Sequence, residues 1–502
     1  MATICVPLRV HRPEELIGAI DVAARNGNLV EVRADYLSEP EAALPVVRDL
    51  PDELQCRVIL TMRTPEQGGQ LPHSEDVRRA FWSRASQLPN VLFDVELDLL
   101  QKQSELSFDL DRVICSHHDF TRVPEDVVEI YQRMAATQAR IMKIAVQAND
   151  ATDCLSIFKL LGRAHDDNRE LIAIAMGHRG LMTRVLGPSR GSILTYGSLD
   201  DESPTAPGQI TATDLRNLFR IDSIDSATQI TGLIGNPVSH SLSPHIHNAA
   251  FAAAGLNAVF VPIEVDEAVA FLRTMVRPDS REIDWSLSGL SVTAPHKSTV
   301  ISELNWIDAA AREIGAVNTI VVDGDELHGH NTDAVGFIKP LKQRHEPLAD
   351  LRCAVVGAGG AARAAIWALK QGGADVTVFA RDKTKAEFLS KTFGVKYQQL
   401  LPRSFAGYDL LVNATPLGTR GNRENESAVT AEQLRGVRLA YDLVYNPSET
   451  RFLRAAHAAG CETIGGLEML IAQAVAQFKL WTGKQPNVDV MRAAATRQLR
   501  IE

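Results

Sequence analysis

One lysine in the first half of the chain is placed where its amine could act as a nucleophile. Lys143 lies within Ile141–Val146, an apolar run that is typical of a buried strand. A lysine removed from water loses its proton more easily, and the free amine can attack a ketone to form an imine. A lysine whose amine reaches solvent from the strand end is the more common arrangement, so the residue alone leaves both roles open.

A histidine and three arginines could complete such a site. His118 follows the preceding predicted strand and could take the proton next to an imine carbon, then protonate a departing hydroxyl, although a polar loop histidine is the ordinary alternative. A planar guanidinium matches a carboxylate, so three arginines indicate an anionic substrate unless they are solvated surface residues: Arg33, Arg63 and Arg184. Together these residues fit the loss of water from a β-hydroxy ketone acid through a Schiff base.

A glycine-rich turn in the second half of the chain indicates a dinucleotide site. Gly357, Gly359 and Ala362 lie between a predicted strand, Arg352–Val356, and a predicted helix, Ala362–Gln371. Small residues let the backbone approach a pyrophosphate, which the helix N-terminus then stabilises. A turn of this kind can also serve packing alone.

The basic residues after the next predicted strand, Val376–Phe379, favour NADP. NAD enzymes commonly place an acid at this strand end to bind the ribose hydroxyl, whereas an arginine accommodates the 2′-phosphate. Here Arg381 occupies the end, with Lys383 and Lys385 close by. A solvated basic turn is the alternative.

Polar side chains between these regions could bind and reduce a ketone. Ser241 and Ser243 could bind a carboxylate, or Ser243 could cap a helix before Pro244. Lys297 and Asp333 could supply a proton donor and its electrostatic partner. Without other context, each of the last two would more often be a surface or capping residue.

Eight short β-branched runs alternate with amphipathic stretches in the first ~200 residues, which predicts a (β/α)8 barrel. An open α/β sheet is the alternative. Side chains at the carboxyl ends of barrel strands face the active site, where the lysine, histidine and arginines fall. The runs are Thr3–Val6, Leu29–Arg33, Arg57–Met62, Val91–Glu96, Arg112–Ser116, Arg140–Val146, Leu171–Met176 and Ser192–Tyr196.

The whole chain is predicted to be of the α/β class with two enzymatic halves. A last helix near Thr211–Arg220 closes the barrel domain, residues 1–220, and a small polar linker follows at 221–228. The second half is divided by its patterns into a substrate-binding lobe, a Rossmann lobe and C-terminal helices that return to the substrate lobe: residues 229–340, 341–465 and 466–502.

Composition limits the partners of the protein. The 502 residues carry 52 Lys and Arg against 62 Asp and Glu, a net charge of −10, and no basic run, which argues against nucleic acid. No apolar stretch is long enough to span a membrane, and no signal or transit sequence is visible. The six cysteines lack a CxxC spacing, so we expect neither a metal site nor a disulfide framework. We also expect a cytoplasmic location, small-molecule substrates and a possible homodimer.

Five motifs of the first half resemble type I 3-dehydroquinate dehydratases over about residues 1–220: Glu31–Asp35, Ser116–Phe120, Ile141–Val146, Met176-Gly177 and Thr205–Gln209. The resemblance implies that Lys143 is the Schiff-base lysine and His118 the general acid and base. It implies that the substrate is held by Glu31, Arg33, Arg63, Arg184, Thr205 and Gln209. Two positions depart from the family: Gln67 replaces a glutamate, beside Glu66, and Thr205 replaces a serine.

Separated motifs of the second half arrive in the order found in shikimate dehydrogenases, over about residues 229–502. The resemblance implies that Lys297 and Asp333 are catalytic and that shikimate contacts Ser241, Ser243, Thr293, Asn318, Tyr445 and Gln473. It implies that NADP lies on or near Gly357, Ala358, Gly359, Gly360, Ala361, Arg381, Lys385, Tyr445 and Gly466. Ser291 and Ala380 stand where many relatives have asparagine.

The two resemblances imply consecutive reactions. The first half would dehydrate 3-dehydroquinate to 3-dehydroshikimate, and the second half would reduce that ketone to shikimate with NADPH. One alternative is a catabolic quinate and shikimate dehydrogenase-dehydratase that prefers NAD. Another is a sensor built from inactive enzyme domains, against which Lys143, His118, Lys297 and Asp333 all argue.

Overall fold

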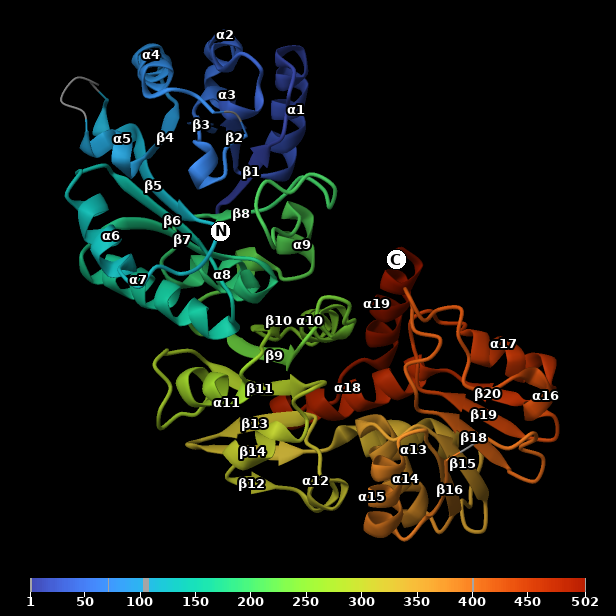
Figure 1. Ribbon diagram of the computed structural model, residues 1–502. Helices are drawn as coiled ribbons and strands as arrows, with labels where there is room; N and C mark the ends of the chain where they lie inside the picture. The colour runs from blue at the N-terminus through green and yellow to red at the C-terminus, as the bar shows by residue number, and fades with distance from the viewer. Residues whose placement is uncertain (1, 71, 103–107, 400, 502) are drawn as a thin grey trace. The chain divides into compact units, whose positions relative to one another are not determined.

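Eight parallel strands, neighbours in the order β7-β6-β5-β4-β3-β2-β1-β8, form the first sheet of the computed structural model, which describes residues 2–70, 72–102, 108–399 and 401–501 (Figure 1). The strands are β1 Ile4–Leu8, β2 Leu29–Arg33, β3 Val58–Thr61, β4 Leu92–Glu96, β5 Val113–Asp119, β6 Ile141–Gln147, β7 Glu170–Met176 and β8 Thr195–Tyr196. A single bridge between Leu171 and Ser192 brings β7 to the segment before β8, because β8 is only two residues long. The predicted barrel is confirmed.

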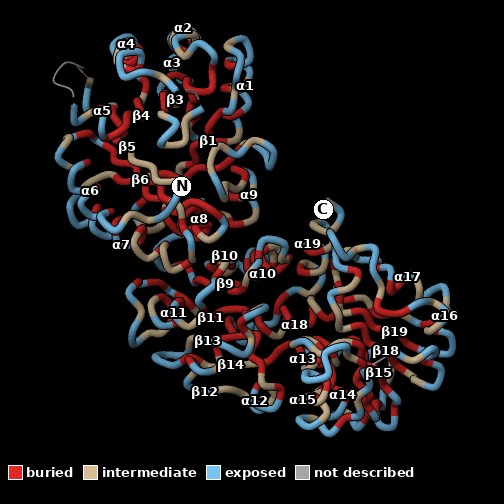
Figure 2. Tube along the Cα trace, viewed as in Figure 1, coloured by how far each residue is buried: buried red, intermediate tan, exposed pale blue. Residues whose placement is uncertain are grey.

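Helices surround the barrel, and most of them bury one face while the opposite face is exposed (Figure 2). Helix α1 buries Leu16, Ile20 and Ala23, three positions that share one helical face. The strands are buried on both faces, as expected for a parallel sheet. The helices are α1 Pro13–Asn26, α2 Ala43–Arg48, α3 Asp52–Gln55, α4 Glu75–Ala85, α5 Leu97–Gln101, α6 Val127–Ala135, α7 Cys154–Asp166, α8 Leu181–Leu186 and α9 Ala212–Asn217.

The inside of the barrel changes from apolar to charged along the strands. Alternate strand residues point inward, and Ile59, Ile114 and Ile172 fill the layer near the amino ends. On the neighbouring strands, Glu31 of β2 and Lys143 of β6 are buried inside the barrel as well. A charged layer therefore lies above an apolar floor, at the end where barrel enzymes place their active sites.

By its internal contacts the chain divides into two units. The first contains Met1–Ser239, Asn257–Val276 and Ser280–Ser286, and the second contains His240–Leu256, Arg277–Asp279 and Leu287–Glu502. Besides the barrel, the first unit holds the parallel strands β9 and β10 and a short helix: Gln229–Gly235, Ala258–Glu264 and α11 Ala268–Phe271. The domain limits drawn from the sequence stay predictions.

The second unit contains an antiparallel group of strands and a Rossmann-type parallel sheet. In the antiparallel group β13 lies between β11 and β14, and β12 pairs with β14: β11 Leu287–Val292, β12 Trp306–Ile307, β13 Thr319–Asp323 and β14 Glu326–His330. The parallel sheet has the order β17-β16-β15-β18-β19-β20: β15 Arg352–Val356, β16 Asp375–Phe379, β17 Lys396–Gln398, β18 Leu410–Asn413, β19 Leu439–Asp442 and β20 Glu462–Ile464.

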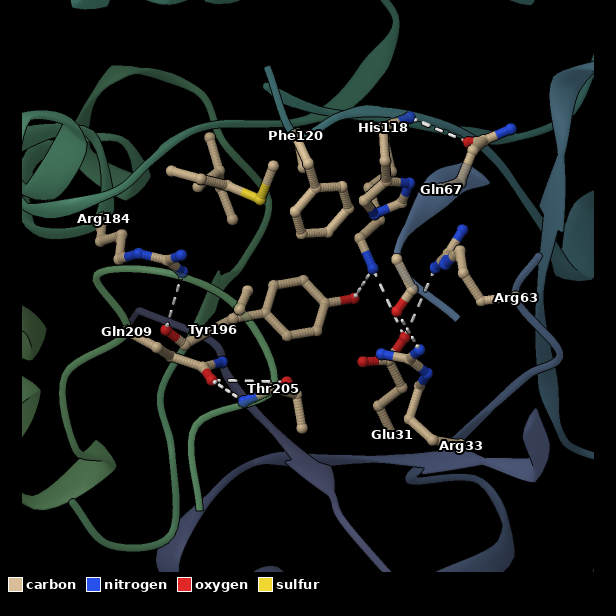
Figure 3. A pocket seen from close by; sticks show the side chains of 16 residues that line it. Glu31, Arg33, Arg63, Gln67, His118, Phe120, Arg184, Tyr196, Thr205 and Gln209 are labelled. Atoms are coloured by element: carbon tan, nitrogen blue, oxygen red, sulfur yellow. Dashed lines mark hydrogen bonds and ion pairs between the residues drawn. The ribbon is translucent and has the colours of Figure 1, made fainter. Parts of the chain in front are cut away.

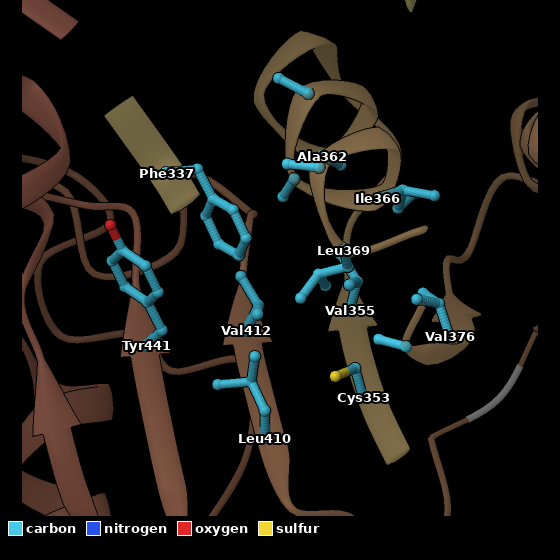
Figure 4. Close-up of a cluster of buried hydrophobic side chains, with 14 of the residues drawn as sticks. Phe337, Cys353, Val355, Ala362, Ile366, Leu369, Val376, Leu410, Val412 and Tyr441 are labelled. Atoms are coloured by element: carbon cyan, nitrogen blue, oxygen red, sulfur yellow. The ribbon is translucent and has the colours of Figure 1, made fainter. Parts of the chain in front are cut away.

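Apolar packing fixes the helix that starts at the glycine-rich turn (Figure 4). Ile366 and Leu369 of α14 pack over Val355 and Val412, and all four are buried. Helix α14 begins at Gly360, two residues before the predicted start. Helix α18 packs against α13 and α19 against α10. The helices of this unit are α10 Ser243–Ala253, α12 Ala309–Ile314, α13 Thr332–Arg344, α14 Gly360–Gln371, α15 Lys383–Phe393, α16 Ala431–Leu434, α17 Arg451–Ala458, α18 Gly466–Thr482 and α19 Val488–Ile501.

A search of the described residues finds no helix that combines the length and the apolar character needed to cross a bilayer.

Candidate active sites

The charged layer of the barrel surrounds a pocket in which Lys143 is buried (Figure 3). Its Nζ donates to Asp94 Oδ2 at 2.9 Å and to the Tyr196 hydroxyl at 2.8 Å, and lies 3.5 Å from Glu31 Oε1. The burial of Lys143 agrees with the prediction from the sequence. The groups around its amine, however, are polar, unlike the apolar strand residues on which that prediction was based. Met142 and Ile144 point outward in the strand alternation, so the amine meets carboxylates from β2 and β4 instead.

Asp94 is a member of this site that the motifs did not indicate. Its Oδ2 accepts from Arg63 Nη2 at 2.8 Å as well as from Lys143. Burial by itself would raise the pKa of Asp94. The positive charges of Arg63 and, to a smaller extent, Lys143 outweigh this effect and hold that pKa far below its usual range. Asp94 alternates with Phe93 and Val95 in a predicted strand, so its inward direction could have been inferred from the sequence.

The two arginines on the β2 and β3 side already have carboxylate partners. Arg33 donates twice to Asp35, at 2.8 and 2.7 Å. Arg63 donates to Asp94 and to the hydroxyl of Ser116. Their charges are therefore largely compensated inside the protein.

Arg184 lies across the pocket, on the other side of the Tyr196 ring (Figure 3). It is 1% exposed and donates to the backbone carbonyls of Tyr196 at 3.5 Å and Pro207 at 3.2 Å. No carboxylate pairs with it in the part of the chain that the structure describes, and burial lowers its pKa to about 10. A buried, uncompensated guanidinium that lines a pocket is suited to an anionic ligand.

The loop after β8 reaches the same pocket. Thr205 and Gln209 both line it, and Gln209 Oε1 accepts from the Thr205 backbone N–H at 2.8 Å. All the barrel residues selected from the sequence therefore lie together. The pocket also contains Tyr196, Phe120, Met176 and Ile174, which were not selected.

His118 lines the pocket, and no carboxylate among the described residues is hydrogen-bonded to its ring. Its backbone N–H donates to Gln67 Oε1 at 2.9 Å, and its buried Nδ1 has no hydrogen-bond partner. Burial first, and then Arg63 and Lys143, lower the pKa of His118 well below its usual value, so the imidazole is neutral. Glu66 is exposed, which leaves Gln67 as the residue that faces the histidine.

In the second unit, Lys297 and Asp333 form an ion pair. The Lys297 Nζ lies 2.5 Å from Asp333 Oδ2, and Asn318 Nδ2 donates to Asp333 Oδ1 at 2.7 Å. The side chain of Lys297 is 23% exposed and that of Asp333 only 9%. Thus the asparagine and the lysine hold one carboxylate at the start of α13, and the ammonium remains accessible.

A further residue, Gln477 of α18, supports this group from behind. Its amide donates to Asn318 O at 3.3 Å and accepts from the Ser291 hydroxyl at 2.9 Å. Gln473 lies one turn earlier and donates to Leu470 O at 3.1 Å. The sequence did not identify Gln477, because the pattern of an amphipathic helix does not show which of its polar residues is buried.

The remaining predicted substrate residues lie at two places in this unit. Ser241 Oγ accepts from the Ser243 backbone N–H at 3.2 Å, at the start of α10. Thr293 and Tyr445 line a cavity with Gly359 and Gly360. The structure thus brings Thr293 and the dinucleotide turn to one cavity.

The glycine-rich turn fits a dinucleotide. Gly357 has a φ of +123°, and a Cβ there would lie 2.6 Å from Ala414 O, so only glycine fits. A Cβ at Gly359 would meet nothing within 4 Å, which leaves open space before α14. Two further glycines adjoin the site: a Cβ at Gly360 would lie 3.7 Å from Lys297 Cδ, and one at Gly466 only 2.5 Å from Val444 O.

The cavity beside this turn has a volume of about 680 Å³ and contains the predicted cofactor residues Ala358, Arg381 and Lys385. Arg423 and Gln399 also line it and were not predicted. Ala361 lines the neighbouring cavity with Thr293. Among the described residues, no group of three or more His, Cys, Asp or Glu side chains could hold a metal ion.

Comparisons with known proteins match both halves. The chain fits the family models "Type I 3-dehydroquinase" over residues 4–226, "Shikimate dehydrogenase substrate binding domain" over 233–320 and "Shikimate 5'-dehydrogenase C-terminal domain" over 466–496. It is 34% identical to a chloroplastic bifunctional 3-dehydroquinate dehydratase/shikimate dehydrogenase of Arabidopsis thaliana, over 96% of this chain and 82% of that protein.

Two further relatives cover the second half. A shikimate dehydrogenase (NADP(+)) of Carboxydothermus hydrogenoformans is 40% identical over 54% of this chain and 98% of its own length. A crystal structure of a shikimate dehydrogenase in complex with NADP+ superposes with a TM-score of 0.51 at 37% identity, covering 55% of this chain and 97% of that chain.

Proposed function

The chain belongs to the family of bifunctional 3-dehydroquinate dehydratase/shikimate dehydrogenases, and on that premise we propose which residues perform its two reactions. The enzyme dehydrates 3-dehydroquinate to 3-dehydroshikimate and then reduces this ketone to shikimate with NADPH. The observation that carries the lyase assignment is the buried amine of Lys143, in one pocket with His118 and the unpaired Arg184.

Lys143 forms the covalent bond to the substrate. Its Nζ attacks the ketone carbon, and the carbonyl oxygen leaves as water when the imine forms. The amine must be neutral to attack, and its hydrogen bonds to Asp94 and Tyr196, both within 2.9 Å of Nζ, hold it in position.

His118 moves the second proton. The imine withdraws electrons from the neighbouring carbon, so the neutral imidazole can remove a proton there. The histidine then returns this proton to the departing hydroxyl, which leaves as water. Hydrolysis of the imine releases 3-dehydroshikimate and restores the amine of Lys143.

Arg184 binds the carboxylate of the substrate, because Arg33 and Arg63 are already paired. Its replacement by methionine should have two opposite effects. We expect KM of the lyase to rise about 10- to 100-fold as a charge-assisted hydrogen bond is lost. We expect the ligand-free barrel to gain about 1–3 kcal/mol, because an uncompensated buried charge is removed. Steady-state kinetics and thermal unfolding measure these effects, and a loss of stability with an unchanged KM would contradict the assignment.

The neutral state of His118 leads to a pH prediction. Protonation blocks proton removal, and the pKa of His118 is depressed, so lyase activity should persist well below pH 6.5. Gln67→Glu adds a negative charge beside the histidine, which raises its pKa and moves the acid limb of the pH profile to higher pH. The control is Glu66→Gln, at an exposed neighbour, which should leave the limb in place. An unchanged limb in Gln67→Glu would contradict a role for His118 as the base.

Lys297 donates a proton to the ketone oxygen in the second reaction, while Asp333, itself held by Asn318, keeps the ammonium in place. NADPH supplies the hydride when it is bound. The turn at Gly357–Ala361 would hold its pyrophosphate, and Arg381 and Lys385 its 2′-phosphate. Ser241 and Ser243 would bind the substrate carboxylate, and Thr293, Tyr445 and Gln473 would contact the rest of the substrate.

A coupled assay tests the whole assignment. When this protein is the only enzyme present and 3-dehydroquinate and NADPH are the only reactants, the nicotinamide absorbance should fall. If it stays constant while added 3-dehydroshikimate is reduced, the lyase half is inactive.

The protein is also proposed to act in the reducing cytoplasm. The six cysteines are all free thiols, and five of them are buried. Assembly as a homodimer and the lack of nucleic-acid partners stay predictions from the sequence, which sedimentation and binding measurements can test.

A further inference from the structure

An acidic residue lies among the basic ones at the far end of the cofactor cavity. Asp382 lines the cavity together with Arg381, Lys385 and Arg423. It follows β16, the second strand of the Rossmann unit, by three residues. An acid in this region of a dinucleotide-binding fold accepts the ribose 2′-hydroxyl of NAD, whereas it repels the 2′-phosphate of NADP.

The structure holds this carboxylate at a defined place. Asp382 caps α15, with Oδ1 accepting from the Lys385 backbone N–H at 3.1 Å. Its other oxygen lies 3.5 Å from the Lys385 ammonium. These two contacts lower the pKa of Asp382, so the group is negatively charged at neutral pH. One of the cations available to a 2′-phosphate is thus partly neutralised by an internal partner.

We propose that Asp382 is a specificity-determining residue that allows the reductase half to use NADH as well as NADPH. Its carboxylate accepts the free 2′-hydroxyl of NADH and draws Lys385 away from the 2′-phosphate of NADPH. Arg381 and Arg423 keep the phosphate site functional. This inference rests on the proposed function, since it assumes that the cavity binds the adenosine end of the cofactor.

Two substitutions remove the charge and keep the helix cap. Asparagine and serine are both favourable N-caps, so Asp382→Asn and Asp382→Ser should fold normally. Asp375→Asn is the control, because Asp375 is an exposed acid at the start of β16 that pairs with Lys396 and does not line the cavity. Shikimate oxidation is then measured with NADP+ and with NAD+.

We expect measurable kcat/KM with both cofactors in the unchanged enzyme. In both Asp382 variants the NADP+ to NAD+ ratio should rise at least about 10-fold, equal to about 1.4 kcal/mol. An unchanged ratio, or an equal rise in Asp375→Asn, would overturn the proposal.

Calorimetric binding separates the two levels of inference. Adenosine 2′,5′-bisphosphate should bind more tightly to the Asp382 variants than to the unchanged protein, and ADP less tightly. If both probes bind but the substitutions leave their relative affinity unchanged, only the role of Asp382 is wrong. If neither probe binds, the cofactor site itself is misplaced, and this inference fails with it.

Discussion

Lys143→Met should abolish dehydration of 3-dehydroquinate while reduction of 3-dehydroshikimate continues at its normal rate. We expect the lyase kcat to fall by at least about 10⁴-fold, because removal of a covalent nucleophile leaves only binding and proton transfer. Methionine preserves the length and apolar contacts of the stem, so the barrel should remain folded. Its near-ultraviolet circular dichroism checks this point. Lys159→Met, at an exposed lysine of α7, is the matched control.

Chemical trapping decides whether the amine bonds to the substrate. Borohydride added with 3-dehydroquinate should reduce the imine and leave a stable adduct on the peptide that contains Lys143. The adduct should be present in Lys159→Met and absent in Lys143→Met. An adduct that survives in Lys143→Met, or no adduct in the unchanged enzyme, would exclude the Schiff-base mechanism at this residue.

Lys297→Met should produce the complementary defect. We expect reductase kcat to fall about 10²- to 10⁴-fold, since the developing alkoxide loses its proton donor. The lyase should be unaffected, so 3-dehydroshikimate should accumulate from 3-dehydroquinate in the presence of NADPH. Lys339→Met, at an exposed lysine of α13, should reduce normally.

The partner of Lys297 gives a second and different signature. Asp333→Asn keeps the hydrogen-bonding shape beside Asn318 but removes the charge that holds the ammonium. We expect kcat to fall with little change in the affinity for NADPH, measured by its fluorescence. A variant that loses cofactor affinity but retains kcat would indicate that Asp333 supports the fold of the cavity rather than proton transfer.

Local sequence patterns were sufficient for the fold. The β-branched runs predicted all eight barrel strands, and Leu29–Arg33 and Arg352–Val356 have the predicted limits. These patterns succeed because the buried residues of a strand and of a helix each recur along the sequence with a characteristic period, whichever elements pack against them. The end of the barrel is the exception: Ser192 and Ile193 do not join β8 and are held by single contacts to Leu171.

Many of the residues that the motifs selected line the pockets of the two units, but the tertiary structure alone decided how they are paired. Strand alternation directs Lys143 and Asp94 inward, yet only the register around the barrel brings them within 2.9 Å. The packing of α8 and of the loop after β3 leaves Arg184 without a carboxylate among the described residues and sets Gln67, rather than Glu66, against His118. Charge compensation depends on residues that are distant in sequence, so no local period can specify it. The sequence by itself therefore determined the elements and their chemistry, and the tertiary structure determined which charges are left for the substrates.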